Sequence, residues 1–363
     1  QLSKLKGDFT FDLDKGLSGN NISLQAFGKP VTAQIVAEGQ PGQMQTRINA
    51  SGQVALKTLT DWLQVKQALP ASGEIPYQLQ LSLGSRDNRL TVDSSLKGLS
   101  IDLPAPFAKA AQDTRDSRFS MTLQGNERRF DARYGDSTRF AYAAPGGKLD
   151  QGRGELLLGA GEPQLPGGKG LRVRGRLDTL DLDAWQQQAQ RLAGDDPGGS
   201  ARQTLQSVDL SIGQIQAFGT QLNQAVVRLA RVASAWDLRL DSREVIGNAR
   251  IPDAKAQPMV VKLQSLRLPP ADPAQAQDDN APDPLASFDP RKVPALDLSI
   301  DKLYRGDDLF GSVALKLRPT PRGVSFNGVD LLIKGLHIDG NGAWEGLPGS
   351  TASWYKGRLD GKN

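Results

Sequence analysis

Carboxylates are the most numerous side chains in this sequence that could carry chemistry. Asp181 and Asp183 lie two residues apart, and Asp195 is followed directly by Asp196. A glycosidase needs two carboxylates held in a cleft with shifted pKa values, and nothing in the surrounding pattern marks a cleft. A solvated strand face together with a helix N-cap accounts for these residues without catalysis. We therefore expect no catalytic carboxylate pair.

The one histidine, His337, lies between Leu336 and Ile338, and strand alternation places its side chain opposite these two neighbours. The chain has 0 Cys and 1 His, which excludes thiol nucleophiles, cysteine-based zinc sites and disulfides, and leaves little basis for histidine catalysis. The run 339–342, Asp-Gly-Asn-Gly, resembles part of a calcium loop but lacks the ligand at the twelfth position. We interpret it as a hairpin turn. We predict no catalytic residue, no metal site and no cofactor.

A glycine-rich run and a mildly basic charge balance are the remaining signals for anionic ligands. The run 166–170, Pro-Gly-Gly-Lys-Gly, lacks the Gly-Lys-Ser/Thr ending of a phosphate loop and opens a strand, so we interpret it as a turn. The net charge is 44 − 40 = +4, and the basic residues are scattered along the chain. Because nucleic-acid binders present a basic stripe interleaved with aromatic residues, we expect no nucleic-acid partner.

The dominant pattern of the sequence is alternation of apolar and polar residues with period two. It is clearest in 77–83 and in 90–96, two segments that flank a turn-rich stretch and so predict a hairpin. Strands of this kind have one apolar face, either packed in an ordinary core or left open as the floor of a groove. If it is a groove, its lining is predicted to include Leu79, Leu81, Leu83, Leu90, Val92, Leu171, Val173, Leu210, Ile212, Leu296, Leu298, Ile300, Val313, Leu315 and Leu317.

Three short helices are expected, near 58–67, 106–112 and 183–192. Two of them belong to an internal repeat, in which the spacing from Gly52 to Trp62 equals that from Gly175 to Trp185. Each copy is predicted to be a strand leading into an amphipathic helix whose Trp plugs one surface of the sheet. We assign structural roles to Trp62, Trp185 and Trp344.

The segment 269–290 differs from the rest of the chain because it is rich in Pro, Asp and Ala. We predict a disordered insertion there, which separates a repeated β-groove segment, 1–268, from a β segment, 291–363, that continues the same sheet. Strand-like alternation begins at the first residues and runs nearly to the end, so we expect the chain to be a piece of a longer protein. The predicted fold is mostly β: an elongated, twisted antiparallel sheet that forms an apolar groove, open or partly closed, with a few short helices.

Two stretches of the chain resemble the YhdP family of AsmA-like proteins. The first is 95–106, where Ser-Leu-Lys-Gly-Leu is followed by Asp-Leu-Pro-Ala-Pro. The second begins at 293–300, Val-Pro-Ala-Leu-Asp-Leu-Ser-Ile, and ends at Gly340-Asn341-Gly342-Ala343-Trp344. The resemblance implies a Gram-negative envelope protein, anchored in the inner membrane by a helix outside this segment, with this segment in the periplasm.

The same resemblance implies a non-enzymatic function: transport of phospholipid along an apolar β-groove from the inner to the outer membrane. The implied partners are phospholipid acyl chains, the two membranes through parts of the protein outside this segment, and other envelope proteins. An alternative is a structural or assembly module that acts through its strand edges. A carbohydrate-active protein would need an aromatic platform and a carboxylate pair in a cleft, neither of which the sequence indicates.

Overall fold

The computed structural model describes residues 2–14, 16–39, 44–65, 67–84, 88–192, 204–217, 220–254, 256–270, 289–347 and 350–361. This part of the chain contains 22 strands and two α-helices, which confirms the mostly β fold. It divides into two compact units, unit 1 (Gln1–Gln206) and unit 2 (Ser207–Asn363), which we describe separately. None of the described helices is long and apolar enough to cross a bilayer.

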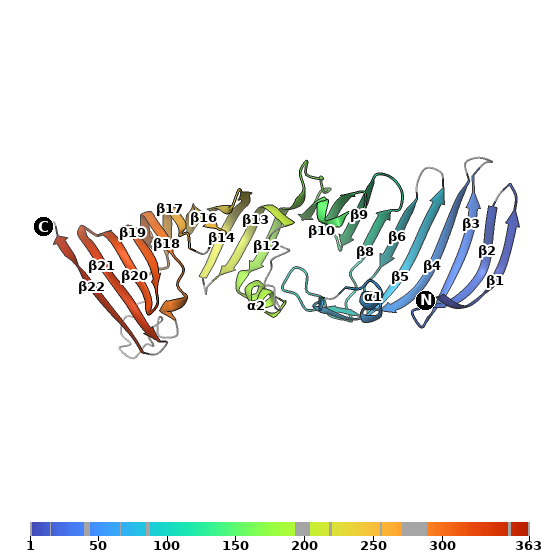
Figure 1. Cartoon of the computed structure of the whole chain (residues 1–363), viewed down its shortest axis with the longest axis horizontal. Coiled ribbons are helices and arrows are strands. Elements are labelled where there is room, and N and C mark those ends of the chain that lie inside the picture. The colour runs from blue at the N-terminus through green and yellow to red at the C-terminus, as the bar shows by residue number, and fades with distance from the viewer. Residues whose placement is uncertain are drawn as a thin grey trace. The chain divides into compact units, whose positions relative to one another are not determined.

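Unit 1 is a twisted sheet whose strands follow one another in chain order (Figure 1). Neighbouring strands pair antiparallel, except β11 and β12, which are parallel, so the sheet is mixed. The short strand β7 pairs with the first residues of β5, and β6 pairs directly with β8. The strands are β1 (Leu2–Asp12), β2 (Gly16–Ala26), β3 (Lys29–Glu38), β4 (Gln45–Ala55), β5 (Ala71–Gly84), β6 (Arg89–Ser94), β7 (Leu99–Ile101), β8 (Ser117–Thr122), β9 (Glu127–Tyr134), β10 (Thr138–Pro145), β11 (Arg153–Leu158) and β12 (Gly170–Asp181).

Both α-helices belong to unit 1 and follow directly on strands: α1 (Leu56–Trp62) on β4, and α2 (Leu182–Leu192) on β12. Asp181 caps α2, because its Oδ1 accepts a hydrogen bond from the backbone N–H of Ala184 at 2.8 Å. Figure 1 shows the two helices beside the ends of the strands and not across the face of the sheet. The helices therefore leave most of that face without a second layer.

The helix expected at 106–112 is absent, and that prediction is wrong. Lys109 instead forms an antiparallel bridge with Ile101: each backbone N–H donates to the other's carbonyl, at 2.8 and 3.1 Å. The Lys109 side chain is buried, and its Nζ donates to the carbonyls of Leu99 and Ala110 at 2.7 and 2.9 Å. These bonds hold the segment extended, because a helix would direct the same backbone groups along its own axis.

Unit 2 is also a twisted sheet with its strands in chain order, and only β17 and β18 are parallel. The predicted insertion falls almost entirely on 271–288, outside the described residues, as do Asp195 and Asp196. The run 339–342, expected as a hairpin turn, lies inside a strand, so that prediction is wrong. The strands are β13 (Leu205–Ala217), β14 (Thr220–Val232), β15 (Ala235–Asp241), β16 (Val245–Pro252), β17 (Met259–Leu268), β18 (Leu296–Arg305), β19 (Asp308–Thr320), β20 (Gly323–Ile333), β21 (Leu336–Leu347) and β22 (Ser350–Gly361).

Candidate functional site

The register of unit 1 aligns apolar side chains into continuous rows that run across the strands on one face. In one row each residue is the direct partner of the next across β2 to β12, with β7 omitted. Direct cross-strand partners have Cβ atoms about 4.5–5.5 Å apart, so the row is a nearly unbroken apolar strip. Its members are Ile22, Ala33, Ala50, Leu79, Val92, Phe119, Ala132, Phe140, Leu156 and Val173.

A second row of unit 1 lies on the same face, two residues away from the first row along most strands, and it extends to β1. Its middle part carries aromatic and methionine side chains of β8 to β10, which the sequence analysis did not select although 130–134 alternates apolar with charged residues. The members are Phe9, Gly19, Ile35, Ile48, Leu81, Leu90, Met121, Phe130, Tyr142, Gly154 and Leu171.

Unit 2 has an equivalent apolar row that crosses all ten of its strands. It passes through the parallel pair β17–β18 without a break, because Leu263 is the partner of Ile300. The row consists of Leu210, Val227, Leu240, Gly247, Leu263, Ile300, Val313, Leu331, Ile338 and Leu359. Each unit thus has a sheet face that is apolar from its first strand to its last.

All of the predicted groove-lining residues lie on these two faces, either in the rows or at most two residue pairs from them. Leu83 is 40% exposed, whereas Leu210, Ile212 and Ile300 are 8%, 2% and 7% exposed. The remaining predicted residues are half-buried. In a closed sandwich a second layer would bury such leucines almost completely, so this intermediate exposure favours an open apolar floor over a packed core.

A hollow of about 380 Å³ opens on the apolar face of unit 2 and contains two predicted residues, Leu315 and Leu317. Every side chain around it is apolar or aromatic, so water there finds few hydrogen-bond partners and an alkyl chain loses none. The lining residues are Leu315, Leu317, Phe326, Val329, Leu331, Ile338 and Tyr355.

Glycines on the apolar faces are paired with aromatic residues on the neighbouring strand. Gly52 is the register partner of Tyr77, Gly154 of Tyr142, and Gly342 of Phe326. A Cβ at any of these glycines would approach the aromatic side chain to less than 3.0 Å. The rings therefore lie over the glycines. They cover the glycine backbone and fill the space that a side chain would otherwise take.

The opposite face of each sheet is charged, and its charges are paired. In unit 1 Arg118 donates to Asp93 at 2.6 Å; in unit 2 Arg250 donates to Asp237 and Arg318 to Asp297, at 3.0 and 2.6 Å. These pairs are partly exposed and individually contribute little to stability. Together they give each sheet one hydrated face and one apolar face.

One carboxylate on the charged face of unit 1, Glu155, is fully buried. Arg174 Nη2 donates to it at 2.8 Å, Arg172 also donates to it, and the backbone N–H of Gln164 donates at 3.3 Å. Burial alone would raise the pKa of Glu155, but these hydrogen bonds outweigh it and the pKa lies below its usual value. Gln164 belongs to the connection between β11 and β12, so this ionised cluster fixes the connection to the sheet.

The repeated Trp residues occupy equivalent positions in unit 1 but do not plug the sheet. Trp62 packs edge-on against Phe27 with ring centroids 5.5 Å apart, and Trp185 packs against Phe107 at 5.8 Å. Trp62 is nevertheless 61% exposed. Because α1 lies at the strand ends, its Trp reaches the β2–β3 turn and not the apolar rows. Trp344, in unit 2, is half-buried on the apolar face between Val324 and Ser353.

The family comparison covers the full length of this chain. A family model described as YhdP protein matches residues 1–363. No curated protein and no solved structure matches the chain.

Proposed function

The chain belongs to the YhdP family, and from this premise we propose that it carries phospholipid across the periplasm, from the inner to the outer membrane, with the acyl chains against the apolar sheet faces. The membranes themselves would be reached through parts of the protein outside this segment, and other envelope proteins are further partners. No chemical step is required of the chain. The observation that carries the proposal is the unbroken apolar row that crosses every strand of unit 2.

The physical support is the cost of moving an acyl chain through water. A phospholipid with two chains exposes about 30 methylenes, and at about 0.8 kcal/mol each their full hydration costs up to about 24 kcal/mol. A floor of Leu, Val, Ile and Phe removes much of this cost while the headgroup stays hydrated. Because successive side chains in a row are direct partners, an alkyl chain meets no polar side chain as it passes from strand to strand.

Within the described residues the helices leave most of the apolar face uncovered, which fits movement of a lipid better than tight storage. A binding pocket for one ligand encloses most of that ligand's surface, whereas most of the row leucines here are only half-buried. An acyl chain that is contacted on one side only is held weakly at every position. No position along the row therefore binds it much more tightly than the next.

The test is direct analysis of bound lipid. The chain is purified without detergent and examined by native mass spectrometry, with lipid extraction of the same sample. We expect phospholipid to co-purify, and to exchange with isotope-labelled phospholipid from vesicles. A lipid-free chain that takes up none of the labelled lipid would contradict the proposal.

A second function, attachment to other envelope proteins through strand edges, is favoured by β1 and β22. Among the described strands, β1 pairs only with β2, and β22 only with β21. Both carry exposed apolar side chains, including Phe11 at 71% and Trp354 at 56%. Backbone groups along such an edge can pair with another strand. Photo-crosslinking from either edge in cells would capture a protein partner if this function holds, and lipid alone if it does not.

A further inference from the structure

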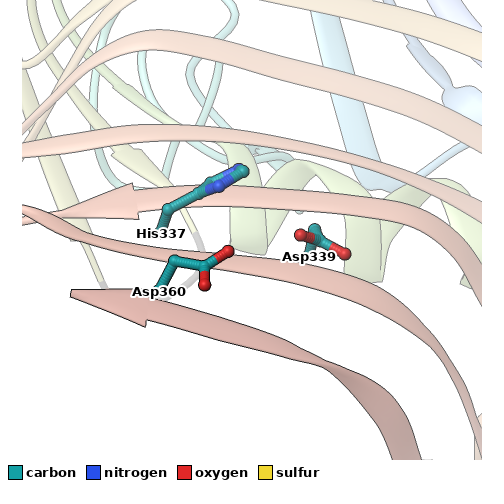
Figure 2. Close-up of side chains that lie close together, drawn as sticks. All are labelled: His337, Asp339 and Asp360. Atoms are coloured by element: carbon teal, nitrogen blue, oxygen red, sulfur yellow. The ribbon is translucent and has the colours of Figure 1, made fainter.

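We propose that His337, Asp339 and Asp360 bind a divalent transition metal ion, with Zn²⁺ as the best-fitting probe. The three side chains lie close together on the charged face of unit 2 (Figure 2). One ligand atom from each lies within 4.8 Å of the others. This site is independent of lipid carriage, because it faces away from the apolar rows.

The sheet itself brings the three residues together. His337 and Asp339 alternate along β21, so their side chains project from the same face. Asp360 on β22 is the direct register partner of His337. The three residues therefore occupy three corners of one ladder segment, an arrangement fixed by backbone hydrogen bonds and not by a loop.

The imidazole of His337 has a carboxylate neighbour of the kind that metal-binding histidines use. His337 Nε2 lies 3.0 Å from Asp330 Oδ1, on the neighbouring strand β20. A metal-binding histidine almost always donates its second ring N–H to a carboxylate or carbonyl, which fixes the ring and its tautomer. In the tautomer that donates from Nε2 to Asp330, Nδ1 carries the lone pair that can coordinate the ion.

Charge balance gives an independent reason to expect a cation. Elsewhere on this face the carboxylates of Asp209, Asp237 and Asp297 are each paired with an arginine, at 3.6, 3.0 and 2.6 Å. Among the described residues, no arginine or lysine forms an ion pair with Asp339 or Asp360. Arg358, the direct register partner of Asp339, contributes one positive charge against the three carboxylates of Asp330, Asp339 and Asp360, and a divalent ion would offset the remainder.

The donor set and the spacing indicate the class of ion. One imidazole and two carboxylates suit zinc and similar first-row ions better than calcium, which prefers oxygen alone and more ligands. Ligand bonds of about 2.0–2.2 Å at tetrahedral angles place the donor atoms roughly 3.3–3.6 Å apart. The exposed Asp360 side chain can supply the small rotation that closes the present spacing, and the remaining coordination positions stay open to water.

Isothermal titration calorimetry with ZnCl₂ on the untagged chain tests the proposal. We expect one saturable site per chain, at least tenfold weaker in both H337Q and D360N. D330N, which replaces the carboxylate beside His337 Nε2 and removes one negative charge from the cluster, should weaken binding about 10- to 100-fold. D209N, on the same charged face but in an arginine pair, is the matched control and should bind as the wild type does. Circular dichroism of each variant establishes that it is folded.

A spectroscopic readout separates coordination from general charge attraction. Co²⁺ in place of Zn²⁺ should give visible absorption bands that disappear in H337Q. Because the chain has no other histidine and no cysteine, an imidazole ligand can come only from His337. Saturable zinc binding that is unchanged in H337Q, or no saturable binding in the wild type, would overturn the assignment.

Discussion

Tyr77 lies across Gly52, its direct partner on the neighbouring strand, on the apolar face of unit 1. A Cβ at Gly52 would stand 2.8 Å from Tyr77 Oη and 2.9 Å from Val31 Cγ2. Burial against this face raises the pKa of the Tyr77 phenol. In this pair the tyrosine ring occupies the space that a side chain at Gly52 would fill.

The first prediction follows from this pair. G52A should destabilise unit 1 by about 1–3 kcal/mol, because the added methyl group must push aside both Tyr77 and Val31. Urea unfolding followed by circular dichroism measures the change. In G168A the new Cβ meets nothing within 4 Å, so its free energy of unfolding should stay within about 0.5 kcal/mol of that of the wild type. Equal effects in the two variants would show that the ring and the glycine are not coupled.

A second prediction separates the two faces of the sheet. L81D places a carboxylate between Ile48 and Leu90 in an apolar row, and it should reduce co-purifying lipid several-fold while the chain stays folded. Q80D changes the adjacent residue, which is exposed on the charged face, and it should retain wild-type lipid. Native mass spectrometry measures lipid occupancy, and circular dichroism measures folding. If L81D unfolds the chain, Leu81 belongs to a packed core, and the interpretation of this face as an open floor is wrong.

The third prediction uses the hollow of unit 2. L331W directs a large side chain into the space bounded by Leu317 and Tyr355, so it should lower the amount of a photoreactive fatty acid crosslinked to β19–β22. L332W is the matched control, because Leu332 is the next residue, is 47% exposed and lies on the other face. Peptide mapping after crosslinking gives the readout. Equal labelling of the two variants would contradict an alkyl-binding role for the hollow.

A fourth prediction concerns pH and Glu155. The pKa of this carboxyl is lower in the folded chain than the value of about 4.3 in an unfolded one. Its stabilising contribution is therefore complete above about pH 4.3 and is lost as the pH falls through the folded pKa. E155Q should reduce the free energy of unfolding by about 1.5–3 kcal/mol at pH 7, because its bonds to Arg172 and Arg174 lose their charge.

Measuring the free energy of unfolding of the wild type and E155Q from pH 7 to pH 3 checks the direction of this pH dependence. The difference between them should shrink toward the acid end. R118Q, which removes an exposed pair with Asp93, serves as the comparison and should change stability by less than about 1 kcal/mol. A gap that is constant across the range would mean that Glu155 is not held ionised by the fold.

The sequence by itself determined the class of structure and the direction in which its side chains point. Period-two alternation separates one face from the other because consecutive side chains of a strand project to opposite sides. That rule placed Leu79 and Leu81 on the apolar face, and His337 with its neighbours on opposite faces. Local chemistry also predicted a helix N-cap at the Asp181 and Asp183 pair, and the structure places it at Asp181, where the interacting groups are three residues apart.

The tertiary structure decided what no local pattern contains: which residues become partners across strands. Bulges shift the register within pairs such as β18–β19 and β19–β20, so a row cannot be followed by counting along the chain. The helix expected at 106–112 gave way to the bridge between Ile101 and Lys109 for the same reason, since that bridge rests on hydrogen bonds between separate segments. Asp360 joins His337 only because β21 and β22 pair in one particular register, set by the sum of their backbone bonds and not by either strand alone.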